Sequence, residues 1–284
     1  MKKAKMAVHR ISSIGRPLSF KYPTNRTIII IVASVFIFGT LIKLVAGDSF
    51  TASIVWAFGA ASALFFAWAL ARELDPDGNA SAFIATAFMF VALFFADLPA
   101  ILALFWILLV TRILNRITGV VPKLLDLTGV IILALVLSWQ ELWVYGLITT
   151  LALYANSWMD GEKKKGIILV VLVLSLLVLS VFFGNSSFTS VEISVLAIVA
   201  ASFLTLLFIP VMCIKTKIKS LTDVTREPVS ANRMRLVRIL AVVTGIMVTT
   251  MQGNTGFINL LPLWAAIGGI VIWNYYRSIK YCRK

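Results

Sequence analysis

Histidine, cysteine and acidic side chains are all scarce in this chain of 284 residues. His9 is the one histidine, and Cys213 and Cys282 are the two cysteines. The scarcity of histidine excludes a histidine-based catalytic triad and a His-rich metal site, and two cysteines do not make a disulfide framework. A metal ion would therefore need oxygen ligands, for which the chain has 12 Asp and Glu residues.

Charged residues of both signs are sparse, and apolar residues take their place. Charged residues make up 13% of the chain and hydrophobic residues 60%, whereas a soluble protein has about 25% charged and about 45–50% apolar residues. This composition predicts an integral membrane protein, with the lipid bilayer as its surroundings. The net charge of +14 comes from basic residues between apolar runs, where they set orientation in a membrane, so we expect no nucleic-acid partner.

Long apolar runs bounded by polar residues predict an all-α, polytopic bundle of about ten transmembrane helices. The runs 80–110 and 127–157 are each too long for one span, because about 31 residues form a helix of about 46 Å and the hydrocarbon core is about 30 Å thick. Asp97 and Pro99 suit the start of a helix and divide the first run; Gln140 and Glu141 divide the second. The predicted spans are 27–46, 52–71, two within 80–110, two within 127–157, 166–184, 191–213, 236–251 and 258–276.

Basic residues predict how the bundle is oriented. With ten spans and the N-terminus inside, every lysine and arginine except Lys43 falls on the cytoplasmic side, as the positive-inside rule requires. We therefore expect a multi-pass protein of the cytoplasmic membrane with both termini cytoplasmic. Its predicted parts are a basic cytoplasmic arm at 1–26, an eight-span body at 27–213, a basic cytoplasmic loop at 214–235, a terminal transmembrane hairpin at 236–276 and a basic cytoplasmic tail at 277–284.

The most concentrated polar stretch between two apolar runs is the segment 71–80. Asp75-Pro76-Asp77-Gly78 fits a type I turn, and Arg72 precedes it where a basic side chain can hydrogen-bond the last carbonyls of a helix. This interpretation makes the segment a tight cytoplasmic turn. In the alternative interpretation, Asp75, Asp77 and Asn79 provide oxygen ligands for Mg²⁺ or Ca²⁺.

Two further cytoplasmic loops, at 112–126 and 154–163, would lie beside this segment if the second, fourth and sixth spans pack together. Divalent ions commonly bridge one or two carboxylates to substrate phosphates, and basic side chains bind the same phosphates. The predicted metal ligands are Asp75, Asp77, Asn156, Asp160 and Glu162, and the predicted phosphate ligands are Arg72, Arg116 and Lys163. The alternative is a set of solvated loop charges that follow the positive-inside bias.

Two of these loops also resemble motifs of a known family. The run Asn115-Arg116-Ile117-Thr118 with Pro122 looks like the basic motif near the fourth helix of UbiA-type membrane prenyltransferases. A second, acidic motif of that family is similar to the set Tyr154, Ala155, Asp160, Glu162, Lys163 and Gly166. The resemblance covers residues 72–166 and implies an isoprenoid diphosphate substrate and Mg²⁺. The chain departs from the family in its first acidic motif, in the intervals between motifs and in the number of spans.

These features favour a membrane-embedded transferase that acts on a polyprenyl or lipid (di)phosphate with Mg²⁺ at the cytoplasmic face; no catalytic residue is assigned. A ten-span small-molecule transporter is one alternative, because the number of spans and the internal termini resemble the drug/metabolite transporters. No charged residue lies near a predicted span centre, however, where coupled transporters often keep one. A non-catalytic membrane scaffold is the third interpretation.

Overall fold

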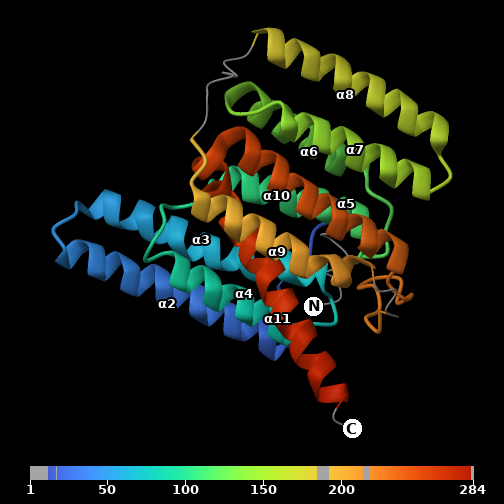
Figure 1. The fold of residues 1–284 in the computed structure, drawn as a ribbon. Coiled ribbons are helices and arrows are strands. Elements are labelled where there is room, and N and C mark those ends of the chain that lie inside the picture. Colours follow the sequence, from blue (N-terminus) through green and yellow to red (C-terminus); the bar gives the residue numbers. More distant parts are fainter. Residues whose placement is uncertain (1–11, 17, 184–191, 214–217, 283–284) are drawn as a thin grey trace.

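The computed structural model describes residues 12–16, 18–183, 192–213 and 218–282 of the chain. These residues form ten α-helices and no β-strand, so the all-helical prediction is confirmed (Figure 1). The helices are α2 Pro23–Val45, α3 Phe50–Leu74, α4 Asn79–Ala92, α5 Ile101–Asn115, α6 Leu124–Gln140, α7 Val144–Met159, α8 Lys163–Phe183, α9 Val195–Cys213, α10 Ala231–Asn259 and α11 Leu261–Cys282.

Both of the overlong apolar runs divide where polar residues predicted a break. The first run becomes α4 and α5, with Asp97 in the connection, and the second becomes α6 and α7, with α6 ending at Gln140. The prediction that Asp97 caps the following helix is wrong. The residue before α5 is Ala100, which makes no side-chain capping bond, and Asp97 lies too far ahead of Ile101 to accept from the first helical N–H groups.

Four helices, α2, α3, α9 and α10, are long and apolar enough to cross a membrane by length and composition. The shorter apolar helices are α4, α5, α6 and the 166–178 part of α8. A full span takes about 20 residues at 1.5 Å per residue, which the four long helices reach and the shorter apolar helices do not.

Large apolar side chains cover the outer helices. Ile30, Phe38 and Ile42 of α2 are exposed, as are Ile168 of α8 and Leu196 of α9. Soluble monomers rarely expose continuous apolar surface of this extent, because water disfavours it. Lipid tails solvate the same surface without penalty, so the outer face of the bundle is consistent with an integral membrane protein.

Helix α3 is largely buried and packs against α2, α4, α5 and α11 (Figure 1). Small residues, among them Ala60, Ala63 and Ala67, are fully buried on it and let its neighbours approach closely. A residue without a side chain also allows α11 to approach α4 closely. A Cβ added at Gly269 would lie 2.5 Å from the backbone oxygen of Ser81, so only glycine permits this approach.

One end of the bundle gathers five polar segments: the N-terminal segment (residues 12–16 and 18–22) and the connections 75–78, 116–123, 160–162 and 218–230. We call it the polar end. Direct polar contacts tie these segments to one another and to the helix ends, namely Ser13 to Asp126, Arg16 to Glu73, Asp77 to Ser220 and Arg233 to Asp160. Consecutive helices that run in alternating directions bring every second connection to the same end, which is how segments so distant in sequence become neighbours.

Candidate functional site

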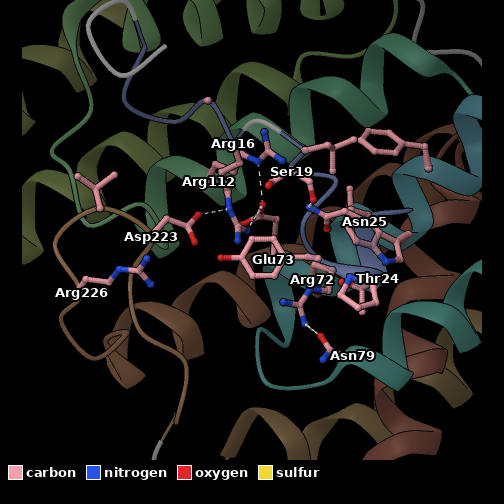
Figure 2. A pocket seen from close by; sticks show the side chains of 18 residues that line it. Arg16, Ser19, Thr24, Asn25, Arg72, Glu73, Asn79, Arg112, Asp223 and Arg226 are labelled. Carbon is pink, nitrogen blue, oxygen red and sulfur yellow. Dashed lines mark hydrogen bonds and ion pairs between the residues drawn. The ribbon is translucent and has the colours of Figure 1, made fainter. Parts of the chain in front are cut away.

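A cavity of about 800 Å³ opens at the polar end between the N-terminal segment, the start of α2, the last turns of α3 and α5, and the connection 218–230 (Figure 2). Four arginines line it: Arg16, Arg72, Arg112 and Arg226. They face two carboxylates, Glu73 and Asp223. The cavity therefore carries an excess of positive charge.

Glu73 pairs with two of the arginines that line this cavity. Its side chain is 1% exposed and accepts hydrogen bonds from Arg16 Nη1 at 3.0 Å, Arg112 Nε at 2.9 Å and Asn115 Nδ2 at 2.8 Å. Asn115 Nδ2 also donates to the Glu73 backbone oxygen at 3.2 Å. A buried carboxylate needs this number of charged and polar partners to remain ionised. Figure 2 shows the two guanidinium groups converging on it.

Arg16 extends the network to the connection 218–230. Its Nε donates to Asp223 Oδ2 at 2.8 Å while its Nη1 holds Glu73. The backbone N–H of Asp223 in turn donates to the Ile117 carbonyl at 2.9 Å, and that of Val224 to the Thr118 carbonyl at 3.1 Å. The connection therefore forms one wall of the cavity and is held to two other segments.

Two of the four arginines, Arg72 and Arg226, have no carboxylate partner among the described residues. Arg72 Nη1 donates to the Pro76 carbonyl at 2.9 Å and to Asn79 Oδ1 at 2.6 Å, both neutral acceptors. Arg226, whose φ is 61°, lines the cavity from the connection 218–230. Arg16 and Arg112 are neutralised by Glu73 and Asp223, so Arg72 and Arg226 are the source of the uncompensated charge.

The lining of the cavity also has an apolar part. Leu18, Tyr22, Phe65 and Trp68 line it, and the rings of Phe65 and Trp68 lie 6.1 Å apart. Two polar atoms among the lining residues, Trp68 Nε1 and Ser19 Oγ, are buried and have no hydrogen-bond partner. Both atoms are enclosed by protein, so they do not face the open space of the cavity.

Asp160, a predicted metal ligand, lies in a second carboxylate–arginine cluster. Arg233 Nη2 donates to its Oδ1 at 2.7 Å, and Arg116 Nη2 pairs with its Oδ2. Arg233 also donates to Asn156 Oδ1 at 3.1 Å and to the Leu114 carbonyl at 3.1 Å. The hollow lined by Asp160 and Asn156 measures about 10 Å³, room for about one water. Asp160 and Asn156 therefore join helix ends rather than face an open site.

Asp75 and Asp77 form the type I turn that their sequence predicts, with the Gly78 N–H donating to the Asp75 carbonyl at 3.1 Å. Burial would raise the pKa of Asp77, but hydrogen bonds from the Ser220 hydroxyl and from the Lys219 and Ser220 backbone N–H groups outweigh burial and hold that pKa below its ordinary value. Asp77 thereby fixes the connection 218–230.

Asp75 behaves differently from Asp77 although only one residue separates them. Asp75 is 6% exposed, and Ser81 Oγ lies 3.4 Å from its Oδ2. Burial raises the pKa of Asp75 above its ordinary value, and the attraction of Arg238 offsets this only in part. Neither aspartate borders the cavity.

The residues predicted to bind Mg²⁺ thus have different surroundings and do not contact one common site. Asp77 holds 219–220, Asp160 is paired with two arginines, and Glu162 is exposed. Within the described ranges, no group of three or more His, Cys, Asp or Glu is placed to hold a metal ion. The side chains present do not fit a shared Mg²⁺ site, and magnesium stays a prediction from the sequence.

Of the three predicted phosphate ligands, Arg72 lines the cavity and the other two do not. Arg116 is the left-handed residue that ends α5, and it is committed to Asp160. Lys163 lies with its Nζ 4.4 Å above the Trp158 ring. Residues that the sequence analysis did not assign complete the site: Arg16, Ser19, Trp68, Glu73, Arg112, Asp223 and Arg226.

A scan of known family models, a search of curated proteins and a search of solved structures each returned no match to this chain. The resemblance to UbiA-type prenyltransferases therefore stays a prediction from the sequence. The candidate site rests on the geometry of its own residues.

Proposed function

We propose that the chain crosses the cytoplasmic membrane ten times, with the polar end and both termini in the cytoplasm. The long apolar helices and the lipid-like outer surface support a membrane location. The basic residues of the cavity and of the Asp160 cluster gather at one end of the bundle, and the positive-inside rule favours the cytoplasm for that end.

Cys213 allows this orientation to be measured without introducing a new cysteine, because Cys213 is exposed at the end of α9. With Cys282→Ser removing the other thiol, a membrane-impermeant maleimide should label Cys213 in inside-out vesicles and not in intact cells. Labelling in intact cells would contradict the proposed orientation.

We propose further that the protein is a transferase whose substrate is a polyprenyl or lipid phosphate bound at the cavity. The observation that carries this proposal is the amphipathic lining: Arg72 and Arg226, without carboxylate partners, on one part and Phe65 and Trp68 on another. Arginine recognises phosphate through charge and paired N–H donors, and an apolar wall suits a hydrocarbon chain.

Each element of the site has a separate task in this proposal. Arg72 and Arg226 attract the phosphate, and the remaining arginines, Arg16 and Arg112, are held in place by Glu73. The connection 218–230 limits access of water, because Asp223 and Asp77 fix it over the polar end. Reduced access of water strengthens the electrostatic contribution of the arginines to binding and to transition-state stabilisation.

The transferase activity is tested with protein purified in detergent, where transport across a membrane cannot occur. Farnesyl phosphate and farnesyl diphosphate are incubated with the protein and with a lipid extract of the host as the source of acceptors, and the products are separated by chromatography. We expect wild-type protein to convert one of them into a new lipid, and Arg72→Gln to slow the conversion by about tenfold or more, as loss of a charged hydrogen bond implies.

Arg26→Gln is the matched control, because Arg26 is an arginine of the same end that does not line the cavity. Its conversion rate should equal that of the wild type. If neither lipid is consumed, the transferase proposal fails, and uptake into sealed vesicles then decides between the transporter and the scaffold.

A further inference from the structure

We infer that the turn between α7 and α8 is a docking surface for the head groups of anionic phospholipids. Lys163 and Lys164 contact the lipid phosphates, and Trp158 lies in the interfacial layer beside them. The inference rests on the membrane location proposed above and does not depend on the transferase activity. It concerns residues that do not line the cavity.

The first support is that all three side chains are accessible from outside the protein. Trp158 is 52% exposed near the end of α7, and Lys163 and Lys164 are exposed in the first turn of α8. Helix α8 lies at the edge of the bundle, where it packs against α7 and α6 (Figure 1). A molecule that surrounds the bundle therefore reaches these side chains directly.

The second support is the position of the lysines along α8. An exposed face of α8 runs from Lys164 through Ile168, Val171 and Val178 to Phe182, and lipid tails solvate such an apolar face. Lys164 precedes Ile168 by about one helical turn, or about 6 Å. The head-group layer on each side of the hydrocarbon core is about 5–7 Å thick. The lysines therefore fall in that layer.

The third support is an excess of positive charge at this turn. The connection 160–162 contains two carboxylates, Asp160 and Glu162, and Asp160 is already paired with two arginines. Lys163 and Lys164 follow directly. The negative surface potential of a leaflet that contains anionic lipid attracts such basic side chains, whereas a zwitterionic leaflet carries no net charge. The charge therefore favours an anionic lipid.

A second lysine–tryptophan pair shows what is particular to this turn. Lys163 Nζ lies 4.4 Å from the centre of the Trp158 ring, and Lys43 Nζ lies 5.2 Å from the centre of the Trp56 ring. Lys43 Nζ is also 3.2 Å from Asp48 Oδ2, so the protein itself neutralises that charge. Lys163 makes no ion pair among the described residues, and the ring positions its ammonium group without neutralising it.

The aromatic rings support the same placement. Tryptophan and tyrosine are enriched where membranes meet water, because their rings are apolar and carry one polar group. The Trp158 ring lies 5.9 Å from that of Tyr154, one turn earlier on α7. Aromatic rings, exposed lysines and a continuous apolar face together fit the bilayer itself, and an acidic soluble protein would match the lysines alone.

The test identifies the lipids that lie beside this turn in vesicles made of equal amounts of dioleoyl phosphatidylglycerol and dioleoyl phosphatidylcholine. The full chain carries the photo-reactive residue p-benzoylphenylalanine in place of Ile167, which is exposed one turn after Lys163. Mass spectrometry of the photo-adducts gives the ratio of the two lipids. Ile42→p-benzoylphenylalanine is the reference, because Ile42 is exposed on α2 beside the neutralised Lys43.

We expect phosphatidylglycerol to be enriched over phosphatidylcholine at position 167 by about fivefold or more relative to position 42, the effect of one basic side chain near an anionic surface. Lys163→Gln combined with Lys164→Gln should abolish the enrichment. Lys219→Gln, at another exposed lysine of the polar end, should leave it unchanged. The inference is overturned if the ratios at the two positions are equal, or if the paired substitutions do not lower the ratio at position 167. If the Ile167 variant does not fold, the neighbouring exposed Ile168 carries the probe instead.

Failure of the inference and failure of the proposed function are distinguishable. Adducts that contain the two lipids equally at both positions reject the inference and retain the membrane location. The absence of lipid adducts at both positions rejects the membrane location and the inference with it. Enrichment of phosphatidylglycerol in a protein that converts no farnesyl phosphate retains the inference and rejects the transferase.

Discussion

Glu73 and Asp160 stand at the same end of the bundle, and each is held by two arginines. Glu73 pairs with Arg16 and Arg112, and Asp160 pairs with Arg116 and Arg233. Their surroundings differ. The cluster at Glu73 borders a cavity of about 800 Å³, whereas the hollow beside Asp160 measures about 10 Å³.

This difference shows that a carboxylate with basic neighbours is not by itself a functional site. In the Asp160 cluster Arg116 and Arg233 share one carboxylate and there is room for about one water, so the cluster joins α5, α7 and α10. In the Glu73 cluster the paired arginines line the same cavity as Arg72 and Arg226, which have no carboxylate partner among the described residues. Arg116 Nε is also buried without a partner, so open space, rather than an unsatisfied group, distinguishes the candidate site from the structural contact.

The largest expected effect is that of Glu73→Gln. It removes the buried negative charge and leaves Arg16 and Arg112 facing each other, so we expect a loss of about 3–5 kcal/mol in the free energy of unfolding. The measurement is the midpoint of thermal unfolding in detergent. Glu227→Gln is the control, because Glu227 is exposed and its loss should change the midpoint little. Equal midpoints for the two variants would contradict the anchoring role of Glu73.

Asp160→Asn should have a smaller effect on stability and none on the affinity for phosphate. The Asp160 side chain is 17% exposed, so water partly solvates the two arginines left behind, and we expect a loss of about 1–3 kcal/mol. The affinity for farnesyl phosphate, measured on the folded fraction by native mass spectrometry, should match that of the wild type. A tenfold loss of affinity would show that the Asp160 cluster belongs to the binding site.

Asp77→Asn and Asp75→Asn should give the smallest effects on stability. At neutral pH we expect a small loss for Asp77→Asn and no loss for Asp75→Asn. The pKa of Asp77 is lowered in the folded state, so its contribution is present above its ordinary pKa and is lost as pH falls through the folded value. We expect Asp77→Asn to lower the free energy of unfolding by about 1 kcal/mol at neutral pH. This difference from the wild type should shrink at about pH 3.

The pKa of Asp75 is raised instead, so ionised Asp75 disfavours folding, and the stability of the wild type should rise as pH falls from above the folded pKa towards the ordinary one. Asp75→Asn should therefore lose no stability at neutral pH. Thermal unfolding midpoints at the two pH values, compared between the variants, test both statements. A larger loss at neutral pH for Asp75→Asn than for Asp77→Asn would contradict them.

Local chain signals predicted that the chain is helical, where the two overlong apolar runs divide, and the turn. The Pro99 and Glu141 regions end apolar runs, and Pro76 with Gly78 specifies the turn, because each acts on the backbone next to it. Arg72, which the sequence predicts as a phosphate ligand, lines the cavity, and its binding of phosphate stays a proposal. These features depend on neighbours within a few residues.

The remaining parts of the site depend on contacts between distant segments. Arg16 reaches Glu73 across 57 positions, and Arg233 reaches Asp160 across 73. Nothing in the sequence indicates which arginine neutralises which carboxylate. The same composition is thus compatible with Asp160 as a ligand and with Asp160 as a structural partner. Trp68 lies within an apolar helix, where a tryptophan whose N–H is paired and one whose N–H is unpaired look alike.

The most direct test of the difference between the two clusters is the position of a bound phosphate. A cryo-electron-microscopy structure of the full chain with farnesyl phosphate would show it. The account predicts phosphate density in the cavity beside Arg72 and Arg226, with the prenyl chain along the apolar part of the lining that includes Phe65. Density at Arg116 and Arg233, or none in the cavity at saturating ligand, would contradict it.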